Sequence, residues 1–529
     1  MLTHAGPSQM DSIPLVVTVG ISGHRKRSQL GDLSRVRTLL RERFRDLRDQ
    51  LIEANGPVEF LLLSPLADGA DRIFVDALRE EEPDAHLLVP MPFDRDAYER
   101  SFGSEDSAED FRRRVADPRT RECFTIPGGR EGEYLRLGRW VVDHADLMFF
   151  LHDGSDYDAA PMDGGTSSVI HYAWSDGDLP GTDDRKGHPV YVYIDTGDGT
   201  AITRGLIRPN PHVRHLVPGG HDHLDARAAR HQRRFDLSIT TIITLAFATG
   251  VIVLLDWWSG GNDVFEMLGG LARVVNWDSL ATLALVILIL LVVTARRRGA
   301  LRDWVESRYL AERLRTLPEL LAAGIPLSRV LEQSRRDPAG SQMARAWHSL
   351  FLAGRTSSIP GGDGSDLPPG ALRARLLSPD SFLTDQIAWH LRKAAAKERL
   401  QRRWTWTRNF LFACSAATSA LAALQYGAGI ATTGDLANHL DFASSLLSLL
   451  LASAAAMAQV KEHGRVAVRY RDTIRRLSEL RRTIRFVETG EGPSRQEELQ
   501  DLVIEGTEIL METTYAWMDT MMEKDPEVA

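Results

Sequence analysis

Four long apolar stretches in the second half of this 529-residue chain limit what it can fold into. None of them contains Lys, Arg, Asp or Glu, and they occupy residues 237–255, 279–295, 409–427 and 442–460. A helix of about 19 residues is roughly 28 Å long, which is close to the hydrocarbon thickness of a lipid bilayer. We therefore expect four transmembrane helices. Four buried core helices of a soluble protein are the alternative.

Charged residues beside these stretches predict their orientation. Clusters of arginine precede the first stretch (227–234) and follow the second (296–298), whereas the loop between them is acidic. The loop between the third and fourth stretches has no Lys or Arg, while basic residues flank this pair on its outer sides. Because basic flanks stay on the cytoplasmic side of a membrane, both termini and the central segment are predicted to be cytoplasmic.

Overall composition is that of a folded protein, with 43% hydrophobic and 26% charged residues. A net charge of −9 argues against nucleic-acid binding. Cys123 and Cys414 provide neither a disulfide framework nor the spacing of a metal site, so neither a metal nor a cofactor is expected. Residues 1–13 form a tail without the segments of a signal peptide, which leaves the first apolar stretch as the expected insertion signal.

Short apolar runs alternate with amphipathic helical patterns between residues 14 and 217. The runs LVVTVG, VEFLLL, HLLVPMP, CFTIP, DLMFFL and VYVYI are typical of buried strands. Strands that alternate with helices form a parallel sheet covered on both faces. The sequence therefore predicts a Rossmann-like, doubly wound α/β domain over 14–217, followed by an all-α, four-span transmembrane domain with cytoplasmic helices.

The rest of the chain is predicted to form two similar membrane units. Residues 218–236 form a linker and juxtamembrane helix, and 237–350 form a first two-span unit with a cytoplasmic helix. Residues 351–379 are predicted to be a flexible loop, and 380–529 a second two-span unit with C-terminal helices. Both units have basic helices on each side of their spans, which indicates an internal duplication and a cytoplasmic helical bundle. Solvated basic flanks that only fix the orientation remain the alternative.

Two glycine turns follow the first two predicted strands and are candidate phosphate sites. The first contains Gly20, Ser22, Gly23, His24 and Arg25, and the second contains Gly69, Ala70, Asp71 and Arg72. Glycine lets backbone N–H groups approach a phosphate at the carboxyl end of a strand. Each turn can also be structural: His24 either contacts the ligand or holds its turn, and Asp71 is equally suited to capping the next helix.

A third turn follows the strand DLMFFL and contains Asp153 and then Gly164, Gly165, Thr166 and Ser167. Gly-Gly-Thr-Ser at the start of a helix offers free backbone donors and two hydroxyl groups to an anion. A simple helix cap is the alternative. The three turns lie on one edge of one sheet, so together they predict a nucleotide pocket. The histidines of 221–223 are not expected to bind metal, and no Walker A, HExxH or GxSxG motif is present.

The soluble half resembles bacterial SLOG-type domains. The ordered motifs GISGHR, SPLADGADRIFVDAL, LLVPMPFDRDAYERSF, GRWVVDHADLMFFLHDG and GGTSSVIHYA carry this resemblance over roughly residues 14–195. That superfamily joins the DprA-like and LOG-like Rossmann folds and includes nucleotide sensors. The resemblance implies a small nucleotide-derived signalling ligand, cyclic or similar to ADP-ribose.

The membrane half is similar to the SLATT family of two-span effector domains. FLTDQIAWHLRKAAAKERLQRRW, the two spans that follow it and EILMETTYAWMD carry this resemblance over 380–520, with a looser match over 225–350. The two resemblances imply a multi-pass protein of the bacterial inner membrane that acts in antiphage defence or related conflicts. Ala, Ser, Thr and Gly in the spans suit close helix packing in a homo-oligomer.

Departures from the LOG pattern favour a sensor over an enzyme. LOG enzymes resemble PGGxGTxxE with a catalytic Glu, whereas this chain has Ser167 in place of a glycine and no carboxylate in the following helix. No catalytic residue is therefore expected. We expect a nucleotide-sensing membrane effector that forms a pore or disrupts the bilayer. A membrane-tethered LOG-like hydrolase, a nucleotide-gated ion channel and a protein-binding scaffold remain as alternatives.

Overall fold

The computed structural model describes most of the chain in two compact units. The described residues are 13–128, 132–154, 165–175, 190–207, 210, 221–259, 277–297, 300–335, 341–355, 367–427, 435–461, 463–487 and 492–522. The first unit combines Met1–Asp222 with Arg313–Leu367, and the second combines His223–Glu312 with Pro368–Ala529. Gly164 and most of the predicted 351–379 loop before residue 367 lie outside the described ranges.

The first unit contains a seven-stranded sheet in the order β4-β3-β2-β1-β5-β6-β7. The strands are β1 (Leu15–Gly23), β2 (Val58–Leu63), β3 (His86–Met91), β4 (Thr120–Thr125), β5 (Leu147–His152), β6 (Val190–Asp195) and β7 (Ala201–Arg204). All neighbours are parallel except β6 and β7. The predicted α/β domain is confirmed, and β7 adds an antiparallel edge strand that the sequence did not predict.

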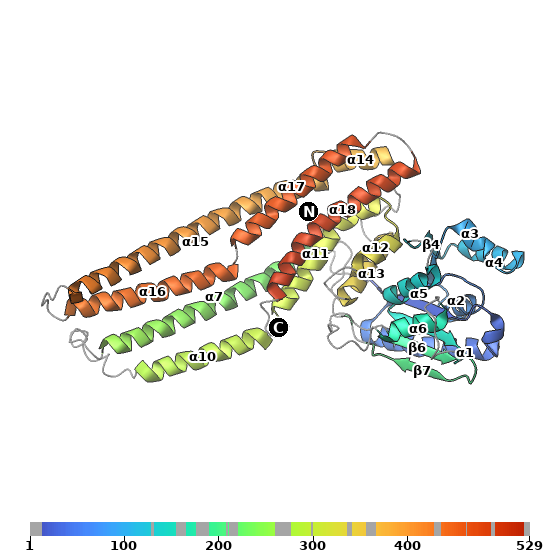
Figure 1. The fold of residues 1–529 in the computed structure, drawn as a ribbon, viewed down its shortest axis with the longest axis horizontal. Coiled ribbons are helices and arrows are strands. Elements are labelled where there is room, and N and C mark those ends of the chain that lie inside the picture. Colours follow the sequence, from blue (N-terminus) through green and yellow to red (C-terminus); the bar gives the residue numbers. More distant parts are fainter. Residues whose placement is uncertain are drawn as a thin grey trace, which may run out of the picture. The chain divides into compact units, whose positions relative to one another are not determined.

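Helices cover both faces of this sheet, as the apolar strands require. α1 (Leu33–Asn55), α2 (Ala70–Glu81), α3 (Arg95–Arg100) and α4 (Glu105–Val115) contribute to one core with alternate strand residues such as Val17, Val19 and Ile21. α5 (Glu133–His144) and α6 (Thr166–Ser175) cover the other face (Figure 1), where a Cβ on Gly20 would lie 2.8 Å from Val141 of α5. A short 3-10 turn, η1 (Arg27–Gln29), follows β1.

Two later helices also belong to the first unit. They are α12 (Leu327–Arg335) and α13 (Ser341–Arg355), and the unit boundary falls inside α11 (Ala300–Ala322). The sequence analysis assigned these residues to the first two-span unit. An amphipathic pattern shows that a helix has an apolar face, but it does not identify the element against which that face packs. The structure instead packs α13 against β1, where Ser349 Oγ accepts a hydrogen bond of 2.8 Å from the Val16 backbone N–H.

The described secondary structure of the second unit is helical. Its helices are α7 (His221–Ser259), α10 (Trp277–Arg297), α14 (Pro369–Leu377), α15 (Phe382–Gly427), α16 (Asp435–Lys461), α17 (His463–Phe486) and α18 (Pro493–Met522), with the first part of α11. Serine pairs join α15 to α16, with Ser415 and Ser448 Oγ atoms 3.0 Å apart. Gly250 lets α7 approach α16, because a Cβ there would lie 2.7 Å from Leu449.

Two helices in the described part of the chain are long and apolar enough to cross a membrane. They are Leu224–Leu255 and His439–Phe486, which contain the first and fourth predicted spans. The second predicted span contains a shorter apolar helix, Thr282–Leu291. The third lies in the long helix α15, whose described residues are not apolar enough to count as a candidate span. Abundant Ala, Ser and Thr make that third stretch less hydrophobic than the first. The helical C-terminal region is therefore shown, and the number of spans stays a prediction.

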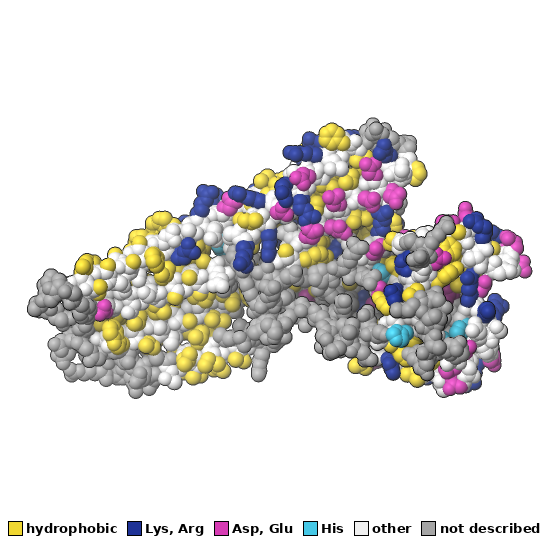
Figure 2. Space-filling model, in the orientation of Figure 1, with side chains coloured by type: hydrophobic (Ala, Val, Ile, Leu, Met, Phe, Trp, Pro, Cys, Tyr) yellow, Lys and Arg dark blue, Asp and Glu magenta, His cyan; other side chains and the backbone are white. Residues whose placement is uncertain are grey.

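Many large apolar side chains in the predicted spans of this unit are exposed. The most apolar windows of both long helices have no buried residue, and large side chains such as Leu237, Phe412 and Leu424 are more than half exposed. Figure 2 shows hydrophobic side chains spread over the face that α16 and α10 present. Exposed apolar surface of this extent is unfavourable in water, which argues against four buried core helices.

Candidate ligand crevice

The candidate site lies where the order of the parallel strands reverses. The chain runs outward from β1 through β2 and β3 to β4, then returns to place β5 on the other side of β1. The loops that follow β1 and β5 therefore diverge toward opposite faces of the sheet. In open α/β sheets, ligands bind in the crevice that this divergence leaves at the carboxyl ends of the strands.

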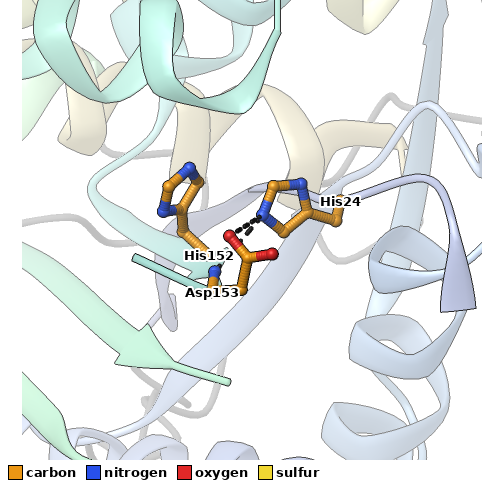
Figure 3. Close-up of side chains that lie close together, drawn as sticks. All are labelled: His24, His152 and Asp153. Atoms are coloured by element: carbon orange, nitrogen blue, oxygen red, sulfur yellow. Dashed lines mark hydrogen bonds and ion pairs between the residues drawn. The ribbon is translucent and has the colours of Figure 1, made fainter. Parts of the chain in front are cut away.

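His24 and Asp153 meet at this point. His24 follows β1, Asp153 follows β5, and His24 Nε2 lies 3.1 Å from Asp153 Oδ1 (Figure 3). The same ring nitrogen lies 3.2 Å from the Asp153 backbone nitrogen, so it accepts that N–H when neutral and donates to the carboxylate when protonated. Only 13% of the His24 side chain and 25% of the Asp153 side chain are exposed. The pair thus holds the two loops together beside solvent.

His152, the last residue of β5, links this pair to α6. Its ring is fully buried and stacks on His24 with ring centroids 4.6 Å apart. Its Nδ1 accepts a hydrogen bond of 3.0 Å from the Gly154 N–H, so Nε2 carries the proton and donates to Ser167 Oγ at 2.8 Å. The first turn of α6 is therefore fixed to the same loops.

These three residues also have the composition of a metal site. Ligand atoms of His24, His152 and Asp153 all lie within 4.8 Å of one another. A metal ion binds the lone pair of a ring nitrogen, yet the His152 lone pair already accepts from Gly154. Metal binding would require breaking that hydrogen bond. The arrangement therefore fits a polar support for the loops better than a metal centre.

A crevice of about 230 Å³ opens beside Asp153. Loops after β1, β5 and β6 form its walls together with the first turn of α1. Asp32 caps α1 by accepting a hydrogen bond of 2.9 Å from the Ser34 N–H, and Arg35 Nη2 lies 3.5 Å from the Gly199 carbonyl oxygen. The lining residues are Ser28, Gln29, Gly31, Asp32, Arg35, Val36, Leu39, Asp153, Thr196, Gly197 and Gly199.

Sequence reasoning missed most of these lining residues. Of the predicted site residues that the structure describes, only Asp153 lines the crevice. Two signals were present: Asp32 precedes a helical pattern as a cap does, and Thr196-Gly197-Asp198-Gly199 is another glycine turn after a predicted strand. Neither signal reveals that the two segments meet, since Thr196 Oγ1 reaches the Gln29 carbonyl oxygen, at 2.9 Å, only in the folded chain.

The glycines of the first predicted turn allow close packing. A Cβ on Gly23 would lie 2.4 Å from the Cβ of Ala70, and Gly20 faces α5 in a similar way. Ser22 lies within β1. Arg25 Nη2 donates to the Ser101 carbonyl oxygen at 2.9 Å, and Arg25 is not among the residues that line the crevice. Within this turn, His24 is the residue that the structure places at the candidate site.

The second predicted turn packs against the backbone of the first. Gly69 has a φ of +80°, and a Cβ there would lie 2.5 Å from the Arg25 carbonyl oxygen. The Ala70 N–H at the start of α2 donates to the His24 carbonyl oxygen at 3.1 Å. Protein atoms therefore already use the helix end that was predicted to bind phosphate.

Charged residues of the second turn are buried. Asp71 accepts a hydrogen bond of 3.1 Å from the Ala67 N–H, and burial raises its pKa to about 7. Arg72 forms ion pairs of 3.3 Å with Asp68 and 3.1 Å with Asp110. Its guanidinium also lies over the Phe102 ring. These contacts favour a structural role for Asp71 and Arg72 over direct contact with a ligand.

The third predicted turn lies close to the His24–Asp153 pair. Gly165 and Thr166 open α6, and the Gly165 carbonyl oxygen accepts a hydrogen bond of 3.0 Å from the Ser168 N–H. Ser167 is joined to β5 through His152. Gly164 is outside the described residues. The structure thus brings together His24, Asp153 and Ser167 from three separate predicted strand ends and helix starts.

Comparison with known proteins does not assign this chain to a family. Neither a protein-family model nor a curated protein matches the chain. The function of the chain is therefore inferred from its residues and their arrangement.

Proposed function

We propose that this protein is a nucleotide-sensing integral membrane effector. The α/β domain binds a phosphorylated nucleotide in the crevice beside Asp153, and the helical domain forms a pore or disrupts the bilayer as a homo-oligomer. The observation that supports this most strongly is the polar crevice at the reversal of strand order. Doubly wound folds bind nucleotides at this position.

The chemistry of the crevice suits a nucleotide. The guanidinium of Arg35 suits phosphate oxygens, and the side chains of Ser28 and Gln29 add neutral hydrogen-bonding groups. Carboxylates such as Asp32 and Asp153 accept hydrogen bonds from ribose hydroxyl groups. A single cavity lined by a cation and by carboxylates matches the charges of a sugar phosphate.

The helical domain supports the membrane part of the proposal. Two described helices are long and apolar enough to span a bilayer, and their apolar windows are not buried within the protein. The four apolar stretches support a four-span arrangement, and the charges beside them support cytoplasmic termini. The resemblance to SLOG and SLATT domains supports a bacterial inner membrane. A ligand can change the state of these helices only by binding one conformation more tightly than the other.

Leakage from liposomes tests the proposal directly. The full-length protein is reconstituted into dye-loaded liposomes and exposed to nucleoside mono- and diphosphates and cyclic nucleotides. We expect dye release with at least one of these and none without ligand. Selective ion flux without dye release would indicate the gated-channel alternative. Release that is independent of ligand, or no release or flux with any ligand, contradicts the proposal.

A pair of arginine variants links the response to the crevice. Arg35→Ala removes a cation that lines the cavity, whereas Arg43→Ala removes an exposed cation on the same helix whose nearest carboxylate, in Asp46, is 3.9 Å away. Losing a charge-assisted hydrogen bond costs about 1.5–3 kcal/mol. We expect Arg35→Ala to raise the half-maximal nucleotide concentration by about tenfold or more, and Arg43→Ala to leave it unchanged.

Nucleotide hydrolysis is the second candidate function, and one contact favours it. The imidazole of His24 and the carboxylate of Asp153 lie 3.1 Å apart beside the crevice, as a general acid–base pair does. This pair lies outside the helix that carries the catalytic Glu of the LOG pattern. If the protein is an enzyme, the full-length protein turns over the nucleotide, and Asp153→Asn abolishes this turnover. A sensor binds the nucleotide and leaves it intact.

A further inference from the structure

A second cavity, of about 250 Å³, lies against the outer strands of the sheet. Tyr191 and Tyr193 of β6 line it together with Ile202 and Arg204 of β7. Trp174 of α6 completes this group of side chains, which we call the aromatic pocket. The alternation of β6 places its tyrosines on the face opposite Val190, Val192 and Ile194, which belong to the core with α1. The pocket therefore lies on the α6 side of the sheet.

Among the described residues, aromatic side chains and one cation form most of the walls of this pocket. The rings of Trp174 and Tyr193 have centroids 6.3 Å apart and are inclined by 52°. The Arg204 guanidinium lies 4.7 Å from the centre of the Trp174 ring. Aromatic rings and guanidinium groups both stack on the flat faces of nucleobases, whatever the base. The pocket is therefore suited to a planar heteroaromatic ring.

Neighbouring residues of the chain line the aromatic pocket and the polar crevice. Asp153 lines the crevice, and the next residue, Gly154, lines the aromatic pocket. Consecutive Cα atoms are about 3.8 Å apart, so the two cavities approach each other at this point of the chain. Gly154 has a φ of +75°, and a Cβ there would lie 3.2 Å from Asp195 Oδ2. A side chain at this position would therefore be strained and would crowd Asp195.

We propose that the aromatic pocket holds the base of the nucleotide whose sugar and phosphate occupy the crevice. This inference rests on the proposed function and adds a specificity site to it. The adjacent polar crevice favours a nucleotide over a purely apolar ligand, because Arg35 and Asp153 suit the sugar phosphate that a nucleotide carries. Trp174, Tyr193 and Arg204 then select ligands that carry a base over base-free sugar phosphates.

Calorimetry on the full-length protein in detergent tests this inference. The probes are the monophosphates of adenosine, guanosine, cytidine and uridine, compared with ribose 5-phosphate, which lacks a base. We expect at least one nucleotide to bind about tenfold or more tightly than ribose 5-phosphate, which corresponds to about 1.4 kcal/mol of stacking. Trp174→Ala removes this preference without changing the affinity for ribose 5-phosphate, and Trp174→Phe retains most of it.

Two further variants complete the design. Arg204→Gln changes an exposed side chain and lowers the base preference even if Trp174→Ala fails to fold. Tyr134→Ala removes an exposed aromatic ring of α5 that lies outside the pocket and leaves both affinities unchanged. A base preference that survives in both Trp174→Ala and Arg204→Gln, or equal wild-type affinity for nucleotides and ribose 5-phosphate, overturns the inference alone. Binding of no probe overturns the inference for monophosphates, and the proposed function is overturned with it if nucleoside diphosphates and cyclic nucleotides also fail to bind.

Discussion

Single residues in the loops after β1 and β2 determine whether the candidate site can form. The His24 carbonyl oxygen accepts a hydrogen bond from the start of α2, and Gly69 passes close to that oxygen and to the carbonyl of Arg25. The side chain of His24 is thereby directed to Asp153. A residue that never touches a ligand can therefore control the geometry of the site.

Substituting Gly69 tests this dependence. Gly69→Ala places a Cβ 2.5 Å from the Arg25 carbonyl oxygen, at a φ of +80° that disfavours residues with a side chain. We expect a loss of about 1–3 kcal/mol of stability and weaker nucleotide binding, measured by thermal unfolding and calorimetry. Gly56→Ala provides a control for φ alone, because Gly56 has a φ of +85° and its Cβ would meet nothing within 4 Å. Equal effects of the two substitutions would contradict the role of the Gly69 contact.

The buried Asp71 carboxyl predicts a pH dependence. Burial raises its pKa from 3.8 to about 7, so its contribution to stability is complete below about pH 4 and is lost as the pH rises through 7. An asparagine side chain at this position cannot ionise and keeps an oxygen that can accept from Ala67. We expect Asp71→Asn to match the wild type below about pH 4 and to be more stable by about 2 kcal/mol at pH 5 and by up to about 4 kcal/mol at pH 8, as measured by the midpoint of thermal unfolding. An equal midpoint at pH 8 would count against this assignment.

At the scale of elements, α12 and α13 complete the α/β domain from a distant part of the sequence. Arg345 forms an ion pair of 2.6 Å with Asp146, whose other oxygen accepts a hydrogen bond of 3.0 Å from the Thr18 N–H. The Ser328 N–H donates to Glu122 of β4 at 3.0 Å. Asp146 lies at the amino end of β5, opposite the candidate site. A fragment that ends at residue 217 lacks all of the contacts that α12 and α13 provide.

Removing the Arg345 side chain tests the role of α13. Arg345→Ala leaves a half-buried carboxylate beside Thr18, and breaking a buried ion pair costs about 3 kcal/mol or more. We expect faster backbone hydrogen exchange in 341–355 and at the start of β1, measured by mass spectrometry. Arg43→Ala serves as the exposed control. Unchanged exchange in α13 would show that this contact does not hold the helix.

For the whole molecule, the main question is where the apolar helices lie. α7 begins with a basic, polar segment and continues into an apolar segment that ends near Trp257. The surface of this helix therefore changes from polar to apolar along its length. In the apolar segment, Leu237 and Val253 are more than half exposed. Basic residues at one end and acidic residues beyond the other predict the direction of insertion.

Cysteine labelling tests that direction. In a background in which Cys123 and Cys414 are replaced by serine, the Trp257→Cys variant is expected to react with a membrane-impermeant maleimide in intact cells. The Arg227→Cys variant is expected to react only after the membrane is permeabilised, because the proposed topology places the arginine cluster in the cytoplasm. Labelling of both positions in intact cells, or of neither before permeabilisation, would contradict the proposed topology.

The sequence by itself determined most strands and helices of the α/β domain and the parallel direction of its strands. The run VEFLLL became β2 and VYVYI became most of β6, because a buried apolar run bounded by turns has few other solutions. β7 was not predicted, because Ala201–Arg204 is short and mostly exposed and therefore shows no apolar pattern. His24, Asp153 and Ser167 were identified because polar residues after strands gather at one edge of the sheet.

Only the tertiary structure decided which of these residues meet. The order of strands places β5 and β6 on the other side of β1, so the loop containing Ser28 and Gln29 meets Thr196, more than a hundred and fifty residues away. It also shows that the end of α2 is occupied by the His24 carbonyl oxygen. Local sequence patterns report burial and turns within a few residues, whereas contacts between distant segments depend on how the whole sheet is ordered.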